Sequence, residues 1–95
     1  MIIDVPYKVG DVVTLKMIGG DEVVAKLDEV IDGAYILAKA LVVMMGQQGF
    51  GLAPFVLTAN PDARLTISKS SVICITKTFD NVAKEYIKQT TGIVV

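Results

Sequence analysis

Residues 12–45 read VVTLKMIGGDEVVAKLDEVIDGAYILAKALVVMM, and this stretch decides the fold. Apolar and polar residues alternate through 12–18 and 22–30, which is the period of half-buried strands. Two pairs, Gly19-Gly20 and Asp32-Gly33, separate the segments and favour tight hairpin turns, because glycine adopts positive φ readily. The segment after Asp32-Gly33 is long and apolar apart from Lys39, so it predicts a strand that is buried on both faces or bent around a small barrel.

The larger apolar residues of the first two strands fall on one face of each, which predicts the core: Val13, Leu15 and Met17, then Val23, Ala25 and Leu27. Further along, Gly46-Gln47-Gln48-Gly49 predicts a third hairpin turn. The strand that returns from it contains Pro54, which has no ladder donor, so this strand is expected at an edge or a bulge. Residues 59–70 are polar and predict the longest exposed loop.

A helix is expected near the C-terminus, because apolar residues recur there at helical spacing: Phe79, Val82, Ala83, Tyr86 and Ile87. Asp80 or Thr78 is the expected N-cap, and Gly92 is expected to end the helix. Such an amphipathic helix either covers an open end of the barrel or docks a partner.

These elements predict one mainly β domain over residues 1–95: a small, strongly bent, five-stranded antiparallel open barrel with one C-terminal α-helix. The strands are expected within 11–18, 22–31, 34–46, 49–58 and 71–77, and the helix at 79–90.

Composition favours self-association. Hydrophobic residues make up 53% of the chain and the mean hydropathy is +0.59, so a second copy is a natural place to bury the excess. No charge occurs from Ala40 to Pro61, and this segment predicts a buried hairpin. Its longest fully apolar run, 40–45, is far shorter than the roughly 20 residues of a membrane span, so no membrane partner is expected.

The N-terminus and the cysteine content predict a cytoplasmic protein. The N-terminus lacks the positive region and apolar core of a signal peptide. Cys74 is the single cysteine, so no intrachain disulfide forms, which fits a reducing compartment. Because it lies in an apolar stretch, Cys74 is expected to be buried.

The residue types argue against an enzyme, a metal site or a cofactor. The chain has no histidine, which removes the commonest general base and metal ligand. Asp28, Glu29 and Asp32 cluster around one turn, but Asp28 and Glu29 are expected to point to opposite faces of a strand. The glycines of 46–51 are not followed by a helix or a Lys-Ser/Thr pair, so they predict a hairpin rather than a phosphate-binding loop. The richest polar constellation is the loop set Asn60, Arg64, Lys69, Ser70 and Ser71.

The segment 13–40 resembles the first sequence motif of Sm-like proteins, with Gly20 at the turn glycine and Leu27 at an apolar motif position. Residues 68–75 resemble the second motif, in which Val72 and Ile75 occupy the apolar positions. Tyr35 stands where the first motif has asparagine. The chain looks most similar to divergent Sm-like proteins of phage or environmental viral origin, which implies the cytoplasm of a bacterium or of an infected host cell.

The resemblance implies a homo-oligomeric ring formed by edge-strand pairing, with single-stranded RNA bound by loops at the pore. It assigns RNA contact to Asp32, Tyr35, Arg64, Lys69 and Ser70, with Tyr35 stacking on a base and Lys69 contacting phosphate. Plain cross-strand packing of Tyr35 is the alternative. The alternative function is an oligomeric structural or assembly protein that makes protein contacts without nucleic acid, which the net charge of −1 favours.

Overall fold

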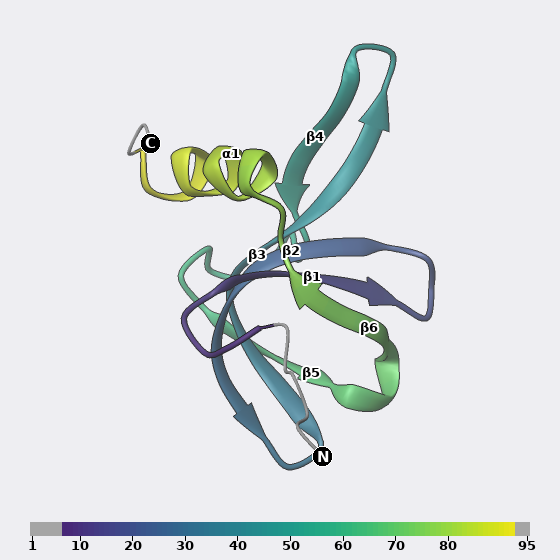
Figure 1. The fold of residues 1–95 in the computed structure, drawn as a ribbon, viewed down its shortest axis with the longest axis vertical. Coiled ribbons are helices and arrows are strands. Elements are labelled where there is room, and N and C mark those ends of the chain that lie inside the picture. Colours follow the sequence, from purple (N-terminus) through teal and green to yellow (C-terminus); the bar gives the residue numbers. More distant parts are fainter. Residues whose placement is uncertain (1–6, 93–95) are drawn as a thin grey trace.

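A computed structural model describes residues 7–92 of the chain. It confirms the predicted class, a mainly β antiparallel fold with one C-terminal helix (Figure 1). The elements in chain order are β1 (Val12–Met17), β2 (Glu22–Ile31), β3 (Ala34–Gly46), β4 (Gly49–Pro54), β5 (Arg64–Ser68), the short 3-10 helix η1 (Lys69–Ser71), β6 (Val72–Lys77) and α1 (Asp80–Thr91). Residues 1–6 and 93–95, which the single-domain prediction includes, lie outside the described part.

The strands form one bent antiparallel sheet in the order β4-β3-β2-β1-β6, with β5 also paired to β3. The long strand β3 pairs with β5 through its first half, Ala34 to Ala38, and with β4 through its second half, Leu41 to Gly46. One edge of β3 is occupied by β2. Strands β4 and β5 therefore lie end to end along the opposite edge. η1 joins β5 to β6 without a ladder between them, so the barrel is open.

The loop predicted at 59–70 was therefore partly wrong, because residues 64–68 form β5. The strand was hidden by its composition: Leu65 and Ile67 are half-buried, while Arg64, Thr66 and Ser68 between them are exposed and polar. The preceding strand ends at Pro54, earlier than expected. The five predicted positions around the barrel are present, but the fourth is filled by two short strands.

The core contains the predicted faces of the first two strands. Side chains of β1, β2 and β3 form one buried cluster: Val13, Leu15, Val23, Ala25, Leu27, Tyr35 and Leu37. Val24 is also buried although it points to the opposite face of β2. It lies near Val82 of α1 and Val43 of β3, so this part of β2 is covered on both faces.

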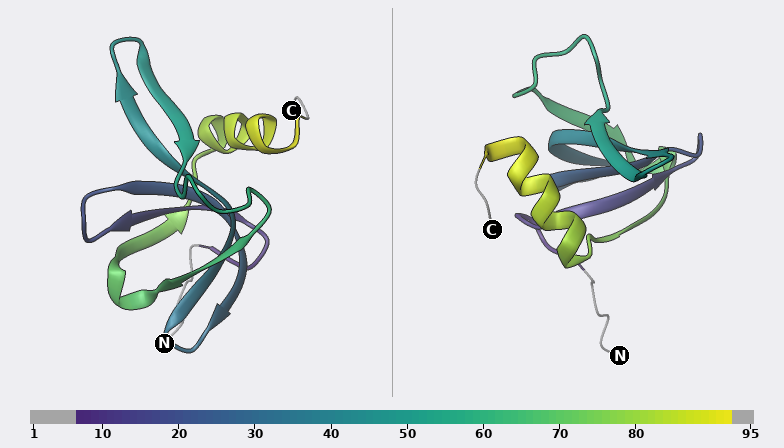
Figure 2. Two further views of the ribbon diagram at one scale, coloured as in Figure 1. Left: turned by 180° about the vertical axis from the view of Figure 1, so that it is seen from behind. Right: turned by 90° about the horizontal axis from the view of Figure 1, so that it is seen from above.

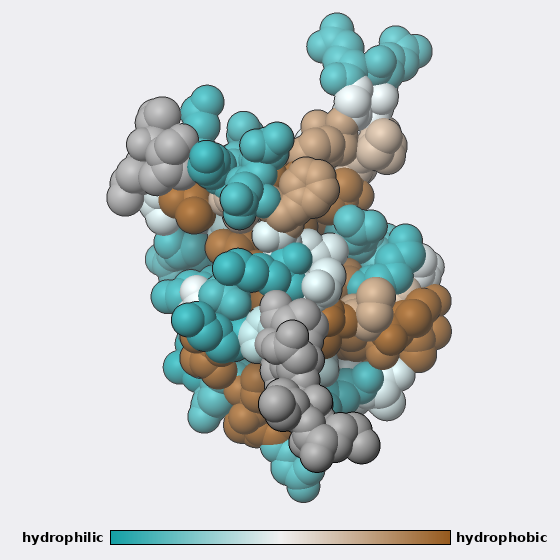
Figure 3. All heavy atoms as spheres, in the orientation of Figure 1, coloured by the Kyte–Doolittle hydropathy of each residue, from teal (hydrophilic) through white to brown (hydrophobic). Residues whose placement is uncertain are grey.

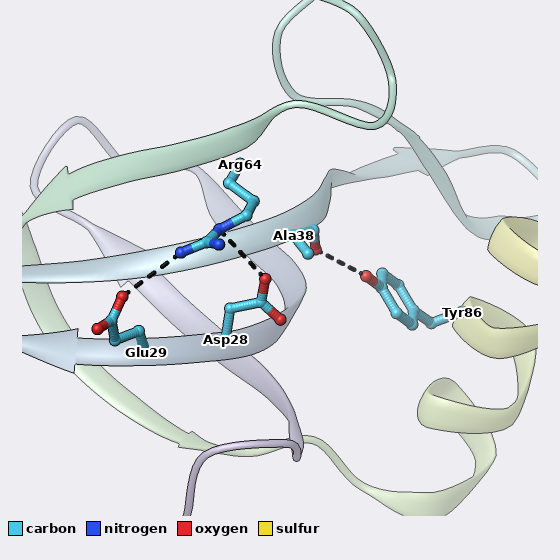
Figure 4. Close-up of polar contacts among 5 residues, drawn as sticks. All are labelled: Asp28, Glu29, Ala38, Arg64 and Tyr86. Atoms are coloured by element: carbon cyan, nitrogen blue, oxygen red, sulfur yellow. Dashed lines mark hydrogen bonds and ion pairs between the residues drawn. The ribbon is translucent and has the colours of Figure 1, made fainter.

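A bulge bends β3 where its partner changes from β5 to β4. The register with β2 shifts by one residue between Val24 and Lys26, and Lys39 on β3 has a φ of 52°. The hydroxyl of Tyr86 on α1 fills this bulge. It donates to the carbonyl oxygens of Ala38 (3.0 Å) and Lys39 (2.8 Å) and accepts from the backbone N–H of Lys26 (3.1 Å). Figure 4 shows the ring of Tyr86 reaching from the helix to β3. One side chain therefore satisfies backbone groups that the bulge takes out of the ladder.

The helix lies outside the sheet, on the face opposite the core cluster (Figure 2). Both expected N-caps were wrong: Phe79 is the N-cap residue and makes no side-chain capping bond. Thr78 is buried instead, with its hydroxyl 2.8 Å from that of Thr14. Gly92 ends the helix as expected, in a left-handed conformation with its N–H donating to the Lys88 carbonyl.

The expected burial of Cys74 was also wrong. Cys74 is exposed on β6, which pairs with β1 and forms an edge of the sheet within residues 7–92. On this strand Val72 and Ile75 pack against the core, and the residues between them face outward.

Candidate functional site

Four of the five residues assigned to RNA contact gather at one corner of the barrel. The backbone N–H of Lys69 donates to the carbonyl of Gly33 at 2.9 Å, which joins η1 to the β2–β3 turn. Asp32 lies in that turn and Tyr35 follows it on β3, while Ser70 lies beside Lys69 on η1. The hydroxyls of Ser68 and Ser70 are 2.8 Å apart and hold the turn of η1.

Tyr35 belongs to the core rather than to the surface of this corner. It is 9% exposed and packs with the buried cluster, as the packing alternative expects, and its contact with RNA stays a prediction. Burial raises the pKa of its phenol, and a hydrogen bond with Tyr7 adds to that rise. The ammonium of Lys69 lies 5.4 Å from the centre of the Tyr35 ring, a cation–π contact worth about 0.5–1 kcal/mol at an exposed site. Lys69 therefore covers the ring, and the exposed polar groups of the corner are Asp32, Lys69 and Ser70.

Arg64 lies apart from this corner, at the opposite end of β5 from η1. Its Nε is 3.4 Å from an oxygen of Asp28, and its Nη2 donates to Glu29 Oε2 at 3.4 Å (Figure 4). These ion pairs are exposed, so each contributes about 0–1 kcal/mol. The two carboxylates offset the positive charge of Arg64, and contact between Arg64 and RNA would depend on that charge.

The expectation that Asp28 and Glu29 point to opposite faces was wrong. The ladder between β2 and β3 shifts register between Leu27 and Glu29, so one residue of β2 is unpaired there. A bulge of this kind breaks the strict alternation of side chains along a strand. Both carboxylates therefore reach the same guanidinium.

The second prominent feature is a hairpin that projects from the barrel. The ladder between β2 and β3 ends at the pair Val23 and Val42, but β3 continues with β4 to the turn at 46–49. We call residues 41–54 the arm (Figure 1). Met45 is 79% exposed and Phe50 is 46% exposed. Figure 3 shows the arm with a hydrophilic tip and apolar residues closer to the barrel. The expected burial of this hairpin is therefore wrong for the single chain, and its role as an interface stays a prediction.

A groove with a volume of about 600 Å³ separates the arm from α1 and the β1–β2 turn. Its apolar lining is Val24, Val43, Met45, Phe50, Phe79 and Val82. Sequence reasoning missed this groove, because it placed Val24 on a polar face and Phe79 on the packed face of the helix. The doublet Val23-Val24 was the available signal, since two adjacent apolar residues in a strand require cover on both faces.

A hydrogen bond from α1 fixes the base of the arm. Gln89 Nε2 donates to the carbonyl of Leu52 on β4 at 2.8 Å. A smaller cavity of about 280 Å³ lies beside this contact, between the end of α1 and residues 54–65, with Leu41, Leu57 and Lys39 in its lining. Two residues of its lining contact each other, since Lys39 Nζ donates to the Thr90 carbonyl at 3.4 Å.

No family model matches this chain, and no curated protein is similar to it. The similarity to Sm-like proteins remains a prediction from the segments 13–40 and 68–75.

Within residues 7–92, no three His, Cys, Asp or Glu side chains gather in a group that could hold a metal ion. Over the same residues, the single helix is neither long enough nor apolar enough to cross a membrane.

Proposed function

We propose that this chain is a self-assembling β module whose arm joins copies into a homo-oligomer. The supporting observation is the arm itself, which is uncharged and carries exposed Met44, Met45 and Phe50. A two-stranded hairpin is marginally stable in water by itself, so contact with another molecule would stabilise this one. The net charge of −1 leaves little electrostatic repulsion between copies.

The ring expected from the Sm-like resemblance is an alternative assembly, in which strand edges rather than the arm join the copies. Among residues 7–92, β5 pairs with β3 alone and β6 with β1 alone, so the described strands leave the outer edges of both unpaired. Free strand edges pair readily with strands of another chain. Pairing of β5 in one copy with β6 in the next would cover both edges and repeat around a closed ring.

A charge placed on the arm tests self-assembly. We expect Met45→Asp to weaken self-association at least about tenfold, which is about 1.4 kcal/mol, because an interface would bury the carboxylate without a partner. Sedimentation equilibrium over a range of protein concentrations measures the change. Leu57→Asp adds the same charge at an exposed position outside the arm and is expected to leave the association nearly unchanged. A wild-type protein that stays monomeric at every concentration contradicts the proposal.

Binding of single-stranded RNA is the second candidate, and the grouping of Asp32, Lys69 and Ser70 at one exposed corner favours it. In a ring this corner would repeat once per subunit, so a single lysine would provide several phosphate contacts. The pairing of Arg64 with Asp28 and Glu29 leaves Lys69 as the main cation of this surface.

Removal of Lys69 tests this second candidate. We expect Lys69→Ala to reduce the slope of log affinity against log salt by about 0.7 for each phosphate that the lysine neutralises in the wild-type complex. Fluorescence anisotropy with a labelled oligouridylate at several salt concentrations measures the slope. Lys84→Ala removes an exposed lysine on α1, distant in sequence from the corner, and serves as the control. If wild-type protein does not bind the oligonucleotide even at low salt, RNA binding is ruled out.

A further inference from the structure

The arm has two faces, and one of them lines the groove. Residues paired across an antiparallel ladder share a face, so the pairs Met45–Phe50 and Val43–Leu52 define one face of the arm. Met45, Phe50 and Val43 line the groove, so this face looks toward α1. Met45 and Phe50 remain exposed there, so the described part of their own chain does not fill the groove.

The opposite wall of the groove also carries an exposed apolar side chain. Phe79 is 68% exposed although it adjoins Val82 in the lining. The phenyl ring makes no capping hydrogen bond, although the residues preferred at an N-cap are small ones whose side chains accept a bond from the backbone. Its place in the wall of an open apolar groove therefore marks it as a contact for another molecule.

We infer that this groove receives the arm of a second copy, and that the exchange is reciprocal. The inference rests on the proposed function and names the surface through which copies associate. In a twofold dimer each arm places Met45 and Phe50 against Phe79 and Val82 of its partner, so one contact forms twice. The groove volume of about 600 Å³ lies within the roughly 300–1,000 Å³ of protein pockets that enclose apolar groups.

Charge at the groove favours a second copy over other occupants. The lining contains two basic residues, Lys16 and Lys77, and two acidic ones, Asp21 and Glu22. A facing copy presents the same two signs, and a twofold axis allows acids of one copy to meet bases of the other. A polyanion such as RNA would meet Asp21 and Glu22 and would leave the apolar lining unmatched. The arm brings apolar side chains and no charge.

Phe79→Ser tests the groove without harming the fold. Serine is a preferred N-cap residue, so the variant is expected to keep or raise the melting temperature while it removes one wall of the groove. We expect its self-association to weaken at least about tenfold. Leu57→Ser is the matched control, because Leu57 is 83% exposed but does not line this groove. Unchanged association of Phe79→Ser, measured by sedimentation equilibrium, would overturn the inference.

Cross-linking between differently labelled copies locates the arm directly. In a Cys74→Ser background, one copy carries Gln47→Cys at the arm tip and a second, affinity-tagged copy carries Thr76→Cys in the groove. After mixing and subunit exchange, a short bis-maleimide is expected to join these two copies. The yield should be several-fold higher than in a control mixture, in which the tagged copy carries Ser70→Cys instead of Thr76→Cys. Ser70 is an exposed residue of η1 outside the groove.

The outcomes separate the inference from the proposed function. Selective joining of positions 47 and 76 supports arm exchange. An oligomer of normal mass that shows equal joining to positions 76 and 70 overturns arm exchange but leaves self-assembly standing. A wild-type monomer overturns both.

Discussion

Replacement of Tyr86 with alanine is expected to lower the free energy of unfolding by about 3–5 kcal/mol, and replacement with phenylalanine by about 1–3 kcal/mol. The alanine variant loses the ring that α1 buries and the hydroxyl that fills the bulge of β3. The phenylalanine variant keeps the ring, so it isolates the backbone groups of Lys26, Ala38 and Lys39 that lose their partner. Urea denaturation followed by circular dichroism measures both changes.

The size of this effect follows from the number of groups that one hydroxyl serves. Domains of this size are stable by roughly 5–15 kcal/mol, so the alanine variant would lose a large fraction of the total. Each kcal/mol lowers the melting temperature by about 4–8 °C in a chain of this length. A phenylalanine variant as stable as the wild type would show that water replaces the hydroxyl at the bulge.

The pH dependence of the same variants provides an independent check. Burial raises the pKa of Tyr86 to about 12, and the negative charge of Asp28 adds to the rise, while the backbone N–H of Lys26 opposes it. In the unfolded chain a tyrosine titrates near 10. Between these values the unfolded chain releases the proton and the folded chain keeps it. The contribution of Tyr86 to the free energy of unfolding is therefore complete below pH 10 and falls by about 1.4 kcal/mol per pH unit toward pH 12.

This titration predicts that the difference between wild type and Tyr86→Phe narrows as the pH rises above 10, because phenylalanine has no proton to lose. Parallel urea titrations of the two proteins measure the difference, so that the lysines and other tyrosines affect both equally. A difference that stays constant over this range would mean that Tyr86 ionises as easily in the folded chain as in the unfolded one.

Truncation of Leu27 is the second large effect that we expect. Leu27 is fully buried on β2 and faces Leu37 of β3 across the ladder. Leu27→Ala leaves a cavity at the centre of the core and should lower the free energy of unfolding by about 2–5 kcal/mol. Leu57→Ala makes the same chemical change at an exposed position and should stay within about 0.5 kcal/mol of wild type. Equal destabilisation of the two variants would contradict the position of the core.

The alternation of side chains was sufficient to predict β1, β2 and the core that they share, because register and burial both follow a period of two. It did not predict the two bulges, since an extra residue in one strand leaves no trace in hydrophobicity. One bulge brings Asp28 and Glu29 within reach of Arg64, and the hydroxyl of Tyr86 binds at the other. The spacing of apolar residues predicted that Tyr86 is buried, but its backbone partners lie 47 to 60 residues away.

Only part of the candidate site was predicted, because contacts between segments that are distant in sequence leave no local pattern. Asp32 and Lys69 come together because the β2–β3 turn and η1 are bonded to each other. Arg64 was grouped with them on sequence proximity, but β5 is extended and carries it about 3.3 Å further away with each residue. The uncharged arm was recognised as a segment that needs burial. Its hydrophobicity cannot specify whether its own chain or another one provides the cover.

The attachment of α1 to the bulge and to the arm has a consequence for the shape of any assembly. Tyr86 bonds to β3 at the point where the arm departs, and Gln89 bonds to β4 at its base. One helix thus sets the angle at which the arm leaves the barrel. A change at Gln89 that removes only its bond to Leu52 would leave Phe79 and Val82 in place but let neighbouring copies meet at varied angles. Its signature under the electron microscope would be polymorphic particles rather than dissociated subunits.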